Sequence, residues 1–478
     1  MDLKQHHITA REDRIPFTQK VAYGMGAIVP IIAISSVNHF TSLYYIIGLG
    51  ISPILIGYAS AIPRVWDAFT DPLVGNLSDN TRSRFGRRIP YVLIGGLLVG
   101  ITFAMLWMPP AGWGQKAVYA YFLIMLLVFY TAITVFMVPH GALGLEMSND
   151  YHERTRVFAY ASFIGNVAAI VSPWLYYIAN RPIFKSDVEG IKWVGIAIGL
   201  IFFLSAMVCA FVCKESKLEQ AEKQKKVKFW ESVKITCKNH TFIMMVVIFV
   251  LVIVGFQLVM GFNSFIMIYY IFSGSKDLAS KWMGWNGTIW AVVAIIGIFP
   301  MTWLSSHLGK RRTVMVALIV MTIGNLLKIV CYSREYPWLT FIPTAMLSFG
   351  MVIVFTLVNA MNADICDEDE LVTGKRREGS YYAVYGWWWK VAASIATVIS
   401  GYILKAARYD HNLAQQSDST LFWLRFWEIG LPAILCSVSV LLLTKYPLTE
   451  DRAYEIKELL KKRGLAAIEA ESGQKEGE

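Results

Sequence analysis

Three ionisable residues, Arg64, Asp67 and Asp71, interrupt an apolar stretch in the first part of the sequence. In a helix, a rotation of about 100° per residue places their side chains within an arc of about 60°, on one face. A charged side chain inside a membrane is costly unless it is paired or hydrated, so we expect this face to point into the protein. Two carboxylates one turn apart can hold a hard cation such as Na⁺. Because two negative charges this close repel each other, the pair can also hold a proton.

A fourth charge, Lys390, interrupts an apolar stretch in the second part of the sequence. At a rise of about 1.5 Å per residue, Asp71 lies about 12 Å and Asp67 about 18 Å from the charged end of their helix. Lys390 lies about 16 Å inside its own helix, and Thr134 lies about 18 Å inside another. Thr70 and Thr134 can add neutral oxygen ligands. The sequence thus predicts a polar site near the middle of a membrane.

The same four charges could instead form a closed structural network. Two positive and two negative side chains sum to zero, and such a network would only hold helices together. The cost of keeping four charges at that depth favours a functional role.

The composition indicates that a lipid bilayer surrounds most of the chain. Hydrophobic residues make up 56% of the 478 residues and charged residues 16%, and the mean hydropathy is +0.48. A helix needs about 20 apolar residues to cross a bilayer. Runs of about this length lie at 21–47, 53–77, 89–109, 115–146, 156–180, 191–213, 240–272, 282–306, 312–333, 338–364, 379–406 and 420–445. We therefore expect an all-α integral membrane protein with twelve transmembrane helices.

Basic residues are concentrated in alternate gaps between these runs, for example at Arg82–Arg88 and Lys310–Arg312. By the positive-inside rule, these gaps and both termini face the cytoplasm. Topology therefore explains the net charge of +10, and no nucleic-acid partner is expected. The six cysteines form no CxxC or Cys/His cluster, so we expect no metal site and no disulfide framework. Residues 1–20 show no signal peptide.

The longest charged gap separates the sixth run from the seventh and divides the chain into two halves. We expect a cytoplasmic segment 1–20, a six-helix bundle 21–213, a cytoplasmic linker 214–239, a second six-helix bundle 240–445 and a cytoplasmic tail 446–478. Each half has a turn of glycine and basic residues after its second run, at Gly86–Arg88 and Gly309–Arg312. Two related halves with pseudo-two-fold symmetry would produce this repeat, although any tight cytoplasmic turn can be rich in these residues.

Two motifs are similar to those of a known family. The first is WDAFTDPL at Trp66–Leu73, followed by NTRSRFGRR at Asn80–Arg88. The second comprises Asp364–Asp367, Thr373–Gly379 and Lys390. Both resemble the glycoside-pentoside-hexuronide:cation symporters, the melibiose permease family within the major facilitator superfamily. The resemblance covers both halves in order, and it implies the major facilitator fold.

The resemblance also implies roles for the charged residues. Asp67 and Asp71 would ligate the coupling cation, with Thr134 beside them, and Lys390 would link the cation site to the sugar site. The sodium-using members have asparagine where this chain has Thr70. The coupling ion is therefore left open as Na⁺ or H⁺, and no other cofactor is expected.

The sugar side departs from the family pattern. Members that carry galactosides have two aspartates and an arginine at positions that correspond to Ile31, Met137 and Ser162. Without those groups we expect a different substrate, such as a uronide or another acidic sugar drawn by Lys390. The substrate-binding candidates are Lys390, Tyr385, Gly386, Trp389, Phe355, Trp387, His39, Gln257 and Asn263. Lone polar residues in spans also commonly hydrogen-bond between helices, and that reading stays open for the last three.

A further set of charges resembles a gate. The acidic cluster that begins at Asp364 lies close in sequence to a run of basic residues, and salt bridges between them could close the cytoplasmic side. An ordinary solvated loop would have the same composition. The gate and network candidates are Arg64, Glu146, Asp364, Asp367, Arg376 and Arg377.

The expected function is cation-coupled symport of a sugar or glycoside by alternating access, in which cation binding to the acidic pair frees Lys390 and completes the solute site. The alternatives are a transporter of lysolipids or other amphiphiles and a nontransporting sensor. No catalytic triad, HExxH motif or phosphate loop is present, so no enzyme is expected. We expect a multi-pass monomer in the plasma membrane, which in a bacterium is the inner membrane.

Overall fold

The computed structural model describes residues 14–148, 150–215, 236, 238–374 and 377–475, and these residues are almost entirely helical. The first part of the chain forms α1 (Phe17–Thr41), α2 (Pro53–Asn80), α3 (Ile89–Leu106), α4 (Gln115–Glu146), α5 (Tyr151–Ala169), α6 (Leu175–Ala179) and α7 (Asp187–Val212). The second part forms α9 (His240–Phe265), α10 (Lys276–Ile296), α11 (Ile298–Cys331), α12 (Phe341–Thr373), α13 (Glu378–Ala406), α14 (Asp418–Thr444) and α15 (Glu450–Lys475). Most of the predicted segment 1–20, most of the predicted linker 214–239 and the gate candidate Arg376 lie outside the described residues.

Within the described residues, nine helical segments are long and apolar enough to cross a membrane. The remaining three of the twelve predicted spans coincide with α2, α10 and α13. Two of these carry charges at the candidate site, on α2 and α13, and these charges lower the mean hydropathy of their helices. Two of the three spans with lower mean hydropathy, α2 and α13, are therefore the spans that carry the candidate charges.

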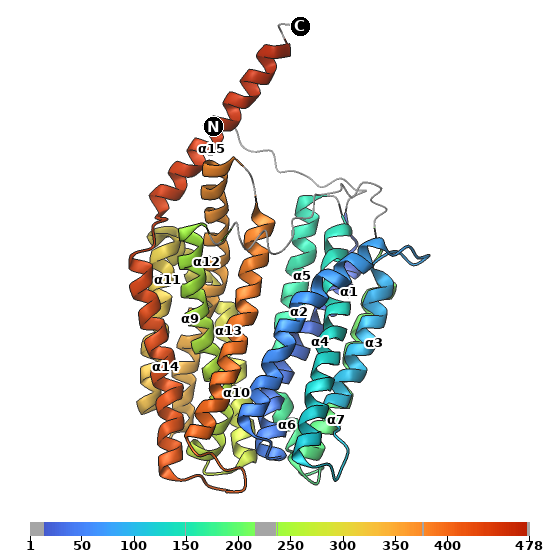
Figure 1. The fold of residues 1–478 in the computed structure, drawn as a ribbon, viewed down its shortest axis with the longest axis vertical. Coiled ribbons are helices and arrows are strands. Elements are labelled where there is room, and N and C mark those ends of the chain that lie inside the picture. The colour runs from blue at the N-terminus through green and yellow to red at the C-terminus, as the bar shows by residue number, and fades with distance from the viewer. Residues whose placement is uncertain (1–13, 149, 216–235, 237, 375–376, 476–478) are drawn as a thin grey trace. The chain divides into compact units, whose positions relative to one another are not determined.

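The described residues pack into two compact units (Figure 1). The first unit comprises 1–223, 260–291 and 397–424, and the second comprises 224–259, 292–396 and 425–478. Four helices, α9, α10, α13 and α14, contribute residues to both units. Packing thus groups the residues differently from the order of the chain, and the boundaries of the two predicted bundles remain a prediction.

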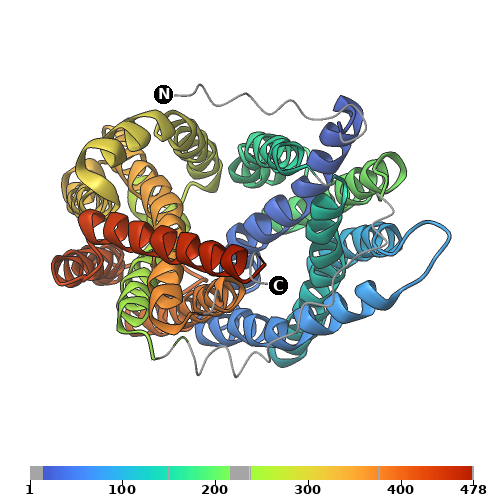
Figure 2. The same ribbon diagram turned by 90° about the horizontal axis from the view of Figure 1, so that it is seen from above.

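In the first unit, α3 packs between α4 and α7 (Figure 2). Small residues allow this close approach, because a Cβ atom on Gly100 would collide with the carbonyl oxygen of Gly199. Gly96 faces the Cβ atom of Ala206 in the same way. Between helices in lipid, such close backbone packing stabilises association where the hydrophobic effect contributes little.

The first span of each half ends in a π-helical segment, Ser42–Gly48 after α1 and Ile266–Ile271 after α9. Both segments contain two adjacent tyrosines, and both are followed within a few residues by a glycine with positive φ, at Gly50 and Gly274. A shared deviation from α-helical geometry at equivalent positions supports an internal repeat.

Two segments differ from the prediction, and one predicted boundary agrees with the structure. The predicted gap 307–311 between spans eight and nine contains Gly309, which breaks α11 with φ 76°. The run 156–180 is interrupted, because Pro173 has no N–H group and the chain forms a 3₁₀ turn at Ser172–Trp174. The tail forms a further helix, α15. Its polar sequence gave no periodic apolar pattern from which to expect a helix.

Candidate functional site

The two aspartates of α2 lie beside α4 in the first unit. Asp67 is buried, with 7% of its surface exposed, and Asp71 is half-buried. The hydroxyl group of Thr134, on α4, donates a hydrogen bond to Oδ1 of Asp71 over 3.0 Å. Thr70 is buried, and its hydroxyl points back to the Trp66 carbonyl at 3.4 Å. Of the cation-binding candidates, the structure thus brings Asp71 and Thr134 into direct contact.

Two prolines inside α2 shape this part of the helix. Pro72 follows Asp71 directly, and it cannot donate the backbone hydrogen bond that the carbonyl of Ala68 would otherwise accept. That carbonyl oxygen lies within one turn of both aspartates. It is a further neutral oxygen of the kind that hard cations bind.

Arg64 contacts two other helices. Its guanidinium group lies 3.5 Å from Oδ1 of Asn38 on α1 and 5.4 Å above the ring of Tyr130 on α4. His39, on α1, has Nδ1 2.8 Å from the carbonyl oxygen of Ser35 in its own helix. These contacts account for both side chains without a substrate, and they leave the role of His39 in solute binding a prediction.

Lys390 lies in the second unit, on α13, and is half-buried. On the same helix, the rings of Tyr385 and Trp389 lie 4.6 Å and 5.8 Å from the ring of Phe249 on α9. Phe355 on α12 completes this aromatic cluster, 5.0 Å from Trp389. Sequence reasoning missed Phe249, since a phenylalanine in an apolar run carries no distinguishing signal.

The other substrate-binding candidates are less closely associated. Gly386 has open space where a side chain would begin, with no atom within 4 Å of the position that a Cβ atom would take. Trp387 packs edge-on against Trp388, with ring centroids 5.1 Å apart. Gln257 and Asn263 are half-buried on α9 and fall in different compact units.

A charge cluster lies at the end of α4 in the first unit, on the face that carries the basic turn Gly86–Arg88. In each unit, the face that carries its basic turn is here called the basic face. Glu146 accepts hydrogen bonds from Arg87 and Arg88 at 2.9–3.2 Å. The carboxylate of Glu215 accepts the backbone N–H groups of Arg87, Arg88 and Ile89 at 2.6–2.9 Å, and it therefore caps the start of α3.

The corresponding cluster of the second half is centred on Asp364, in the last third of α12. Asp364 pairs with Lys310 at 2.5 Å and with Lys457 of α15 at 3.6 Å. Arg377 pairs instead with Asp369, at 3.7 Å. The expected contact between the acidic cluster and the basic run is thus made by Arg377, whereas Asp364 is held by cations from α11 and α15. Asp367 lies on α12 between these two acids.

In both clusters a carboxylate packs against a glycine of the basic turn. Gly86 and Gly309 both adopt positive φ, 101° and 76°. In each case a carboxylate from the segment after the last span of that half packs against the glycine. A Cβ atom would collide with the carboxylate of Glu215 at the first glycine and with that of Glu450 at the second. This agreement supports the internal repeat that the sequence indicated only weakly.

A buried ion pair in the second unit escaped sequence reasoning. Nζ of Lys328 on α11 lies 2.9 Å from Oε1 of Glu428 on α14, with side chains that are 3% and 0% exposed. The hydroxyl group of Tyr332 donates to the same oxygen at 2.8 Å. The signal was present, because both charges interrupt apolar runs in the same way as Asp67 does.

On the face opposite the basic face, helices from the two parts of the chain meet within the first unit. Gly57 of α2 packs on α13, where a Cβ atom would lie 2.8 Å from the Thr397 carbonyl oxygen. Gly401 of α13 packs on Pro53 in the same way, at 2.6 Å. Farther along, Lys276 of α10 forms a salt bridge with Asp187 of α7 at 2.7 Å. These contacts form a second feature that the sequence did not reveal.

Comparison with known proteins gives a consistent result. A family model described as MFS/sugar transport protein matches residues 22–450. The chain is 23% identical to a glucuronide carrier protein homolog of Escherichia coli, over 91% of this chain and 93% of the relative. It is 22% identical to the sodium-dependent lysophosphatidylcholine symporter 1-A of Danio rerio, over 92% of this chain and 88% of the relative.

Among solved structures, a D-xylose-proton symporter superimposes with a TM-score of 0.69 at 13% sequence identity, and the match covers 91% of this chain and 99% of that one. At this identity the likeness concerns the fold. It confirms the predicted fold of twelve helices in two six-helix halves.

Proposed function

Because the chain belongs to the MFS/sugar transport protein family, we propose that it is a symporter in which Asp67 and Asp71 bind the coupling cation. The observation that carries this proposal is the hydrogen bond from Thr134 to Asp71, beside the buried Asp67. Two carboxylates and two or three neutral oxygens form a suitable environment for a monovalent cation near the middle of a membrane. The same pair can instead share a proton.

We further propose that the solute is an acidic sugar. The aromatic cluster of Phe249, Phe355, Tyr385 and Trp389 offers ring faces on which a pyranose can pack. Lys390 lies one residue beyond Trp389 and supplies a positive charge for a carboxylate group. The similarity to a glucuronide carrier protein homolog agrees with this assignment.

Transport would follow alternating access, with the charged loops and both termini in the cytoplasm and the two six-helix halves rocking about the site. Cation binding neutralises the acidic pair, so that Lys390 becomes available to the solute. In this proposal the chain works as a monomer in the plasma membrane.

Substrate counterflow in proteoliposomes tests the choice of solute. We expect exchange of methyl β-D-glucuronide to exceed exchange of the neutral methyl β-D-glucoside by about tenfold, the effect of one charge-assisted interaction. Lys390→Ala should remove this preference, whereas Lys405→Ala, an exposed lysine at the end of the same helix, should keep it. Equal exchange of both glycosides by the unmodified protein would reject an acidic substrate.

A second candidate, a lysolipid, is favoured by an apolar cavity of about 270 Å³ in the first unit. It is lined by Trp66, Leu98, Thr102, Leu127, Val128, Thr131, Ala132 and Val135. Its two threonine hydroxyls donate to carbonyls of their own helices, so an alkyl chain suits it better than a sugar. The Danio rerio relative is a lysophosphatidylcholine symporter. Counterflow of lysophosphatidylcholine without glycoside exchange would select this alternative.

A further inference from the structure

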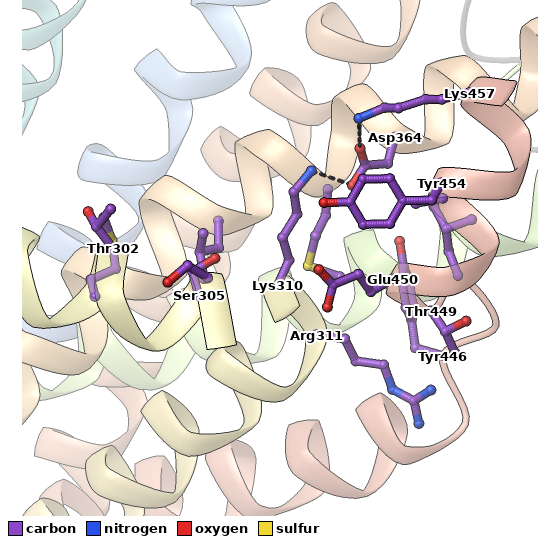
Figure 3. A pocket seen from close by; sticks show the side chains of 16 residues that line it. Thr302, Ser305, Lys310, Arg311, Asp364, Tyr446, Thr449, Glu450, Tyr454 and Lys457 are labelled. Carbon is purple, nitrogen blue, oxygen red and sulfur yellow. Dashed lines mark hydrogen bonds and ion pairs between the residues drawn. The ribbon is translucent and has the colours of Figure 1, made fainter. Parts of the chain in front are cut away.

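A cavity lined by both apolar and charged side chains lies in the second unit, between α15, the first part of α11 and the second half of α12 (Figure 3). Its volume is about 470 Å³, which is large enough for a small molecule. The side chains of Lys310, Asp364, Tyr454 and Lys457 lie close together with Glu450 beside them, and Arg311 extends away from this group. None of the residues proposed for the cation and solute sites lines the cavity. One lining residue, Asp364, is a gate candidate.

The two lysines of the cavity retain hydrogen-bonding capacity. Lys310 donates to Asp364 at 2.5 Å and to the carbonyl of Ala360 at 3.3 Å, and an ammonium group has three donors. Lys457 contacts Asp364 only at 3.6 Å, and 53% of its side chain is exposed. One N–H group of Lys310 and at least two of Lys457 are therefore left for a ligand.

Tyr446 supplies an unused donor of a different kind. Its side chain is 2% exposed and lines the cavity, yet its hydroxyl group has no hydrogen-bond partner among the described residues. A buried hydroxyl without a partner is energetically unfavourable. Burial, with the carboxylates of Glu368 and Asp364 nearby, raises the pKa of Tyr446, so the group remains a proton donor.

The charges of the lining residues favour an acceptor. Three cations, Lys310, Arg311 and Lys457, stand against two carboxylates, Asp364 and Glu450. Arg311 donates to the last carbonyls of α14, at 2.9 Å and 2.5 Å, and helps to hold the cavity together. The residues that line the cavity therefore have a surplus of one positive charge and of N–H and O–H donors, and Glu368, which lies near Tyr446, is not among them.

We propose that this cavity binds the phosphate or carboxylate group of a small anion, held by Lys310, Lys457 and the hydroxyl of Tyr446. The carboxylate of Glu450 limits the charge that fits, so an anion of one or two charges is expected rather than a polyphosphate. The group could belong to a soluble anion or to the headgroup of an anionic phospholipid. Binding would cross-link α15 to α11 and α12.

Two experiments on the full-length protein distinguish these sources. Isothermal titration with inorganic phosphate, in phosphatidylcholine nanodiscs at constant ionic strength, tests for a soluble anion. Native mass spectrometry of protein from nanodiscs with added phosphatidylglycerol tests for a retained lipid. We expect saturable binding in at least one arm, about tenfold weaker in Tyr446→Phe and in Lys457→Ala.

Matched controls separate the site from general charge effects. Tyr336→Phe removes a hydroxyl from an exposed tyrosine outside the cavity, and Lys462→Ala removes an exposed charge from α15. Both should bind as the unmodified protein does. Absence of saturable binding in both arms, or equal weakening by the controls, would overturn the proposal. Neither outcome bears on symport, because transport is measured separately by counterflow.

Discussion

The hydrogen bond between Thr134 and Asp71 connects the two helices that carry the proposed cation site. A hydroxyl that donates to a carboxylate fixes the orientation of that carboxylate, and its oxygen can serve as a ligand when a cation arrives. The site thus depends on one neutral residue that the charge pattern alone would not identify.

Replacing Thr134 by valine tests this dependence. The substitution keeps the shape of the side chain but removes an interaction worth about 1.5–3 kcal/mol. We expect the cation concentration for half-maximal counterflow to rise about tenfold or more. Thr322→Val, on α11 in the second unit, should change it little, because that hydroxyl donates to the carbonyl of Leu318 in its own helix. An unchanged cation dependence in Thr134→Val would exclude this residue from the site.

The buried pair of Lys328 and Glu428 makes a second prediction. Glu428→Gln leaves an ammonium group buried without its counter-charge, at a cost of roughly 3–5 kcal/mol. We expect a clear fall in the thermal unfolding midpoint of the purified protein. The exposed Glu335→Gln should have almost no effect. The apolar double variant Lys328→Met with Glu428→Leu should lose less stability than Glu428→Gln, and a larger loss would contradict this explanation.

Much of the candidate site could be predicted from residue types alone. Asp67, Asp71 and Lys390 interrupt apolar runs, and the depth of Thr134 was estimated from helical rise. The partners of the charges could not be predicted, since contacts such as Asp364 with Lys457 depend on a tail helix without an apolar pattern. Lys328 and Glu428 also interrupt apolar runs, so the criterion that identified the aspartates could have identified this pair as well.

At the scale of helices, the contact between α2 and α13 depends on Gly57 and Gly401. Each faces backbone atoms of the other helix at a distance that no larger side chain allows. Because the two helices come from different halves of the chain, the proposed alternating access would require this contact to open.

A larger residue at Gly401 should therefore favour the state that is open on the face opposite the basic face. Spin labels at Ile183 and Leu413, both exposed in loops of that face, report the change as a longer distance by pulsed electron paramagnetic resonance. We expect Gly401→Val to increase the population with the longer distance. Gly430→Val, at a glycine with open space around it, serves as the control. Identical distance distributions in both variants would show that the contact does not gate that face.

The helices themselves followed from apolar runs of sufficient length, and the predicted runs coincide broadly with the observed helices. The break at Gly309 lies in the predicted gap between spans eight and nine, whereas the π-helical ends and α15 did not follow. Such features arise from packing against neighbouring segments, whereas hydropathy records only the environment of a whole run.

At the scale of the whole molecule, family membership and fold are shown, and the coupling of solute to cation is the central proposal. In this proposal Asp67 and Asp71 bind the cation and the ammonium group of Lys390 binds the solute. The transport cycle requires both binding events. The shared turn design of the two halves fits a duplicated transporter architecture.

Gradient-driven uptake of methyl β-D-glucuronide into proteoliposomes tests the coupling most directly. Under an inward Na⁺ or proton gradient, the unmodified protein should accumulate the solute above equilibrium, and Asp418→Asn, at an exposed position at the start of α14, should do the same. Asp71→Asn should reach only equilibrium. Accumulation by Asp71→Asn with an unchanged gradient dependence would contradict the proposed coupling.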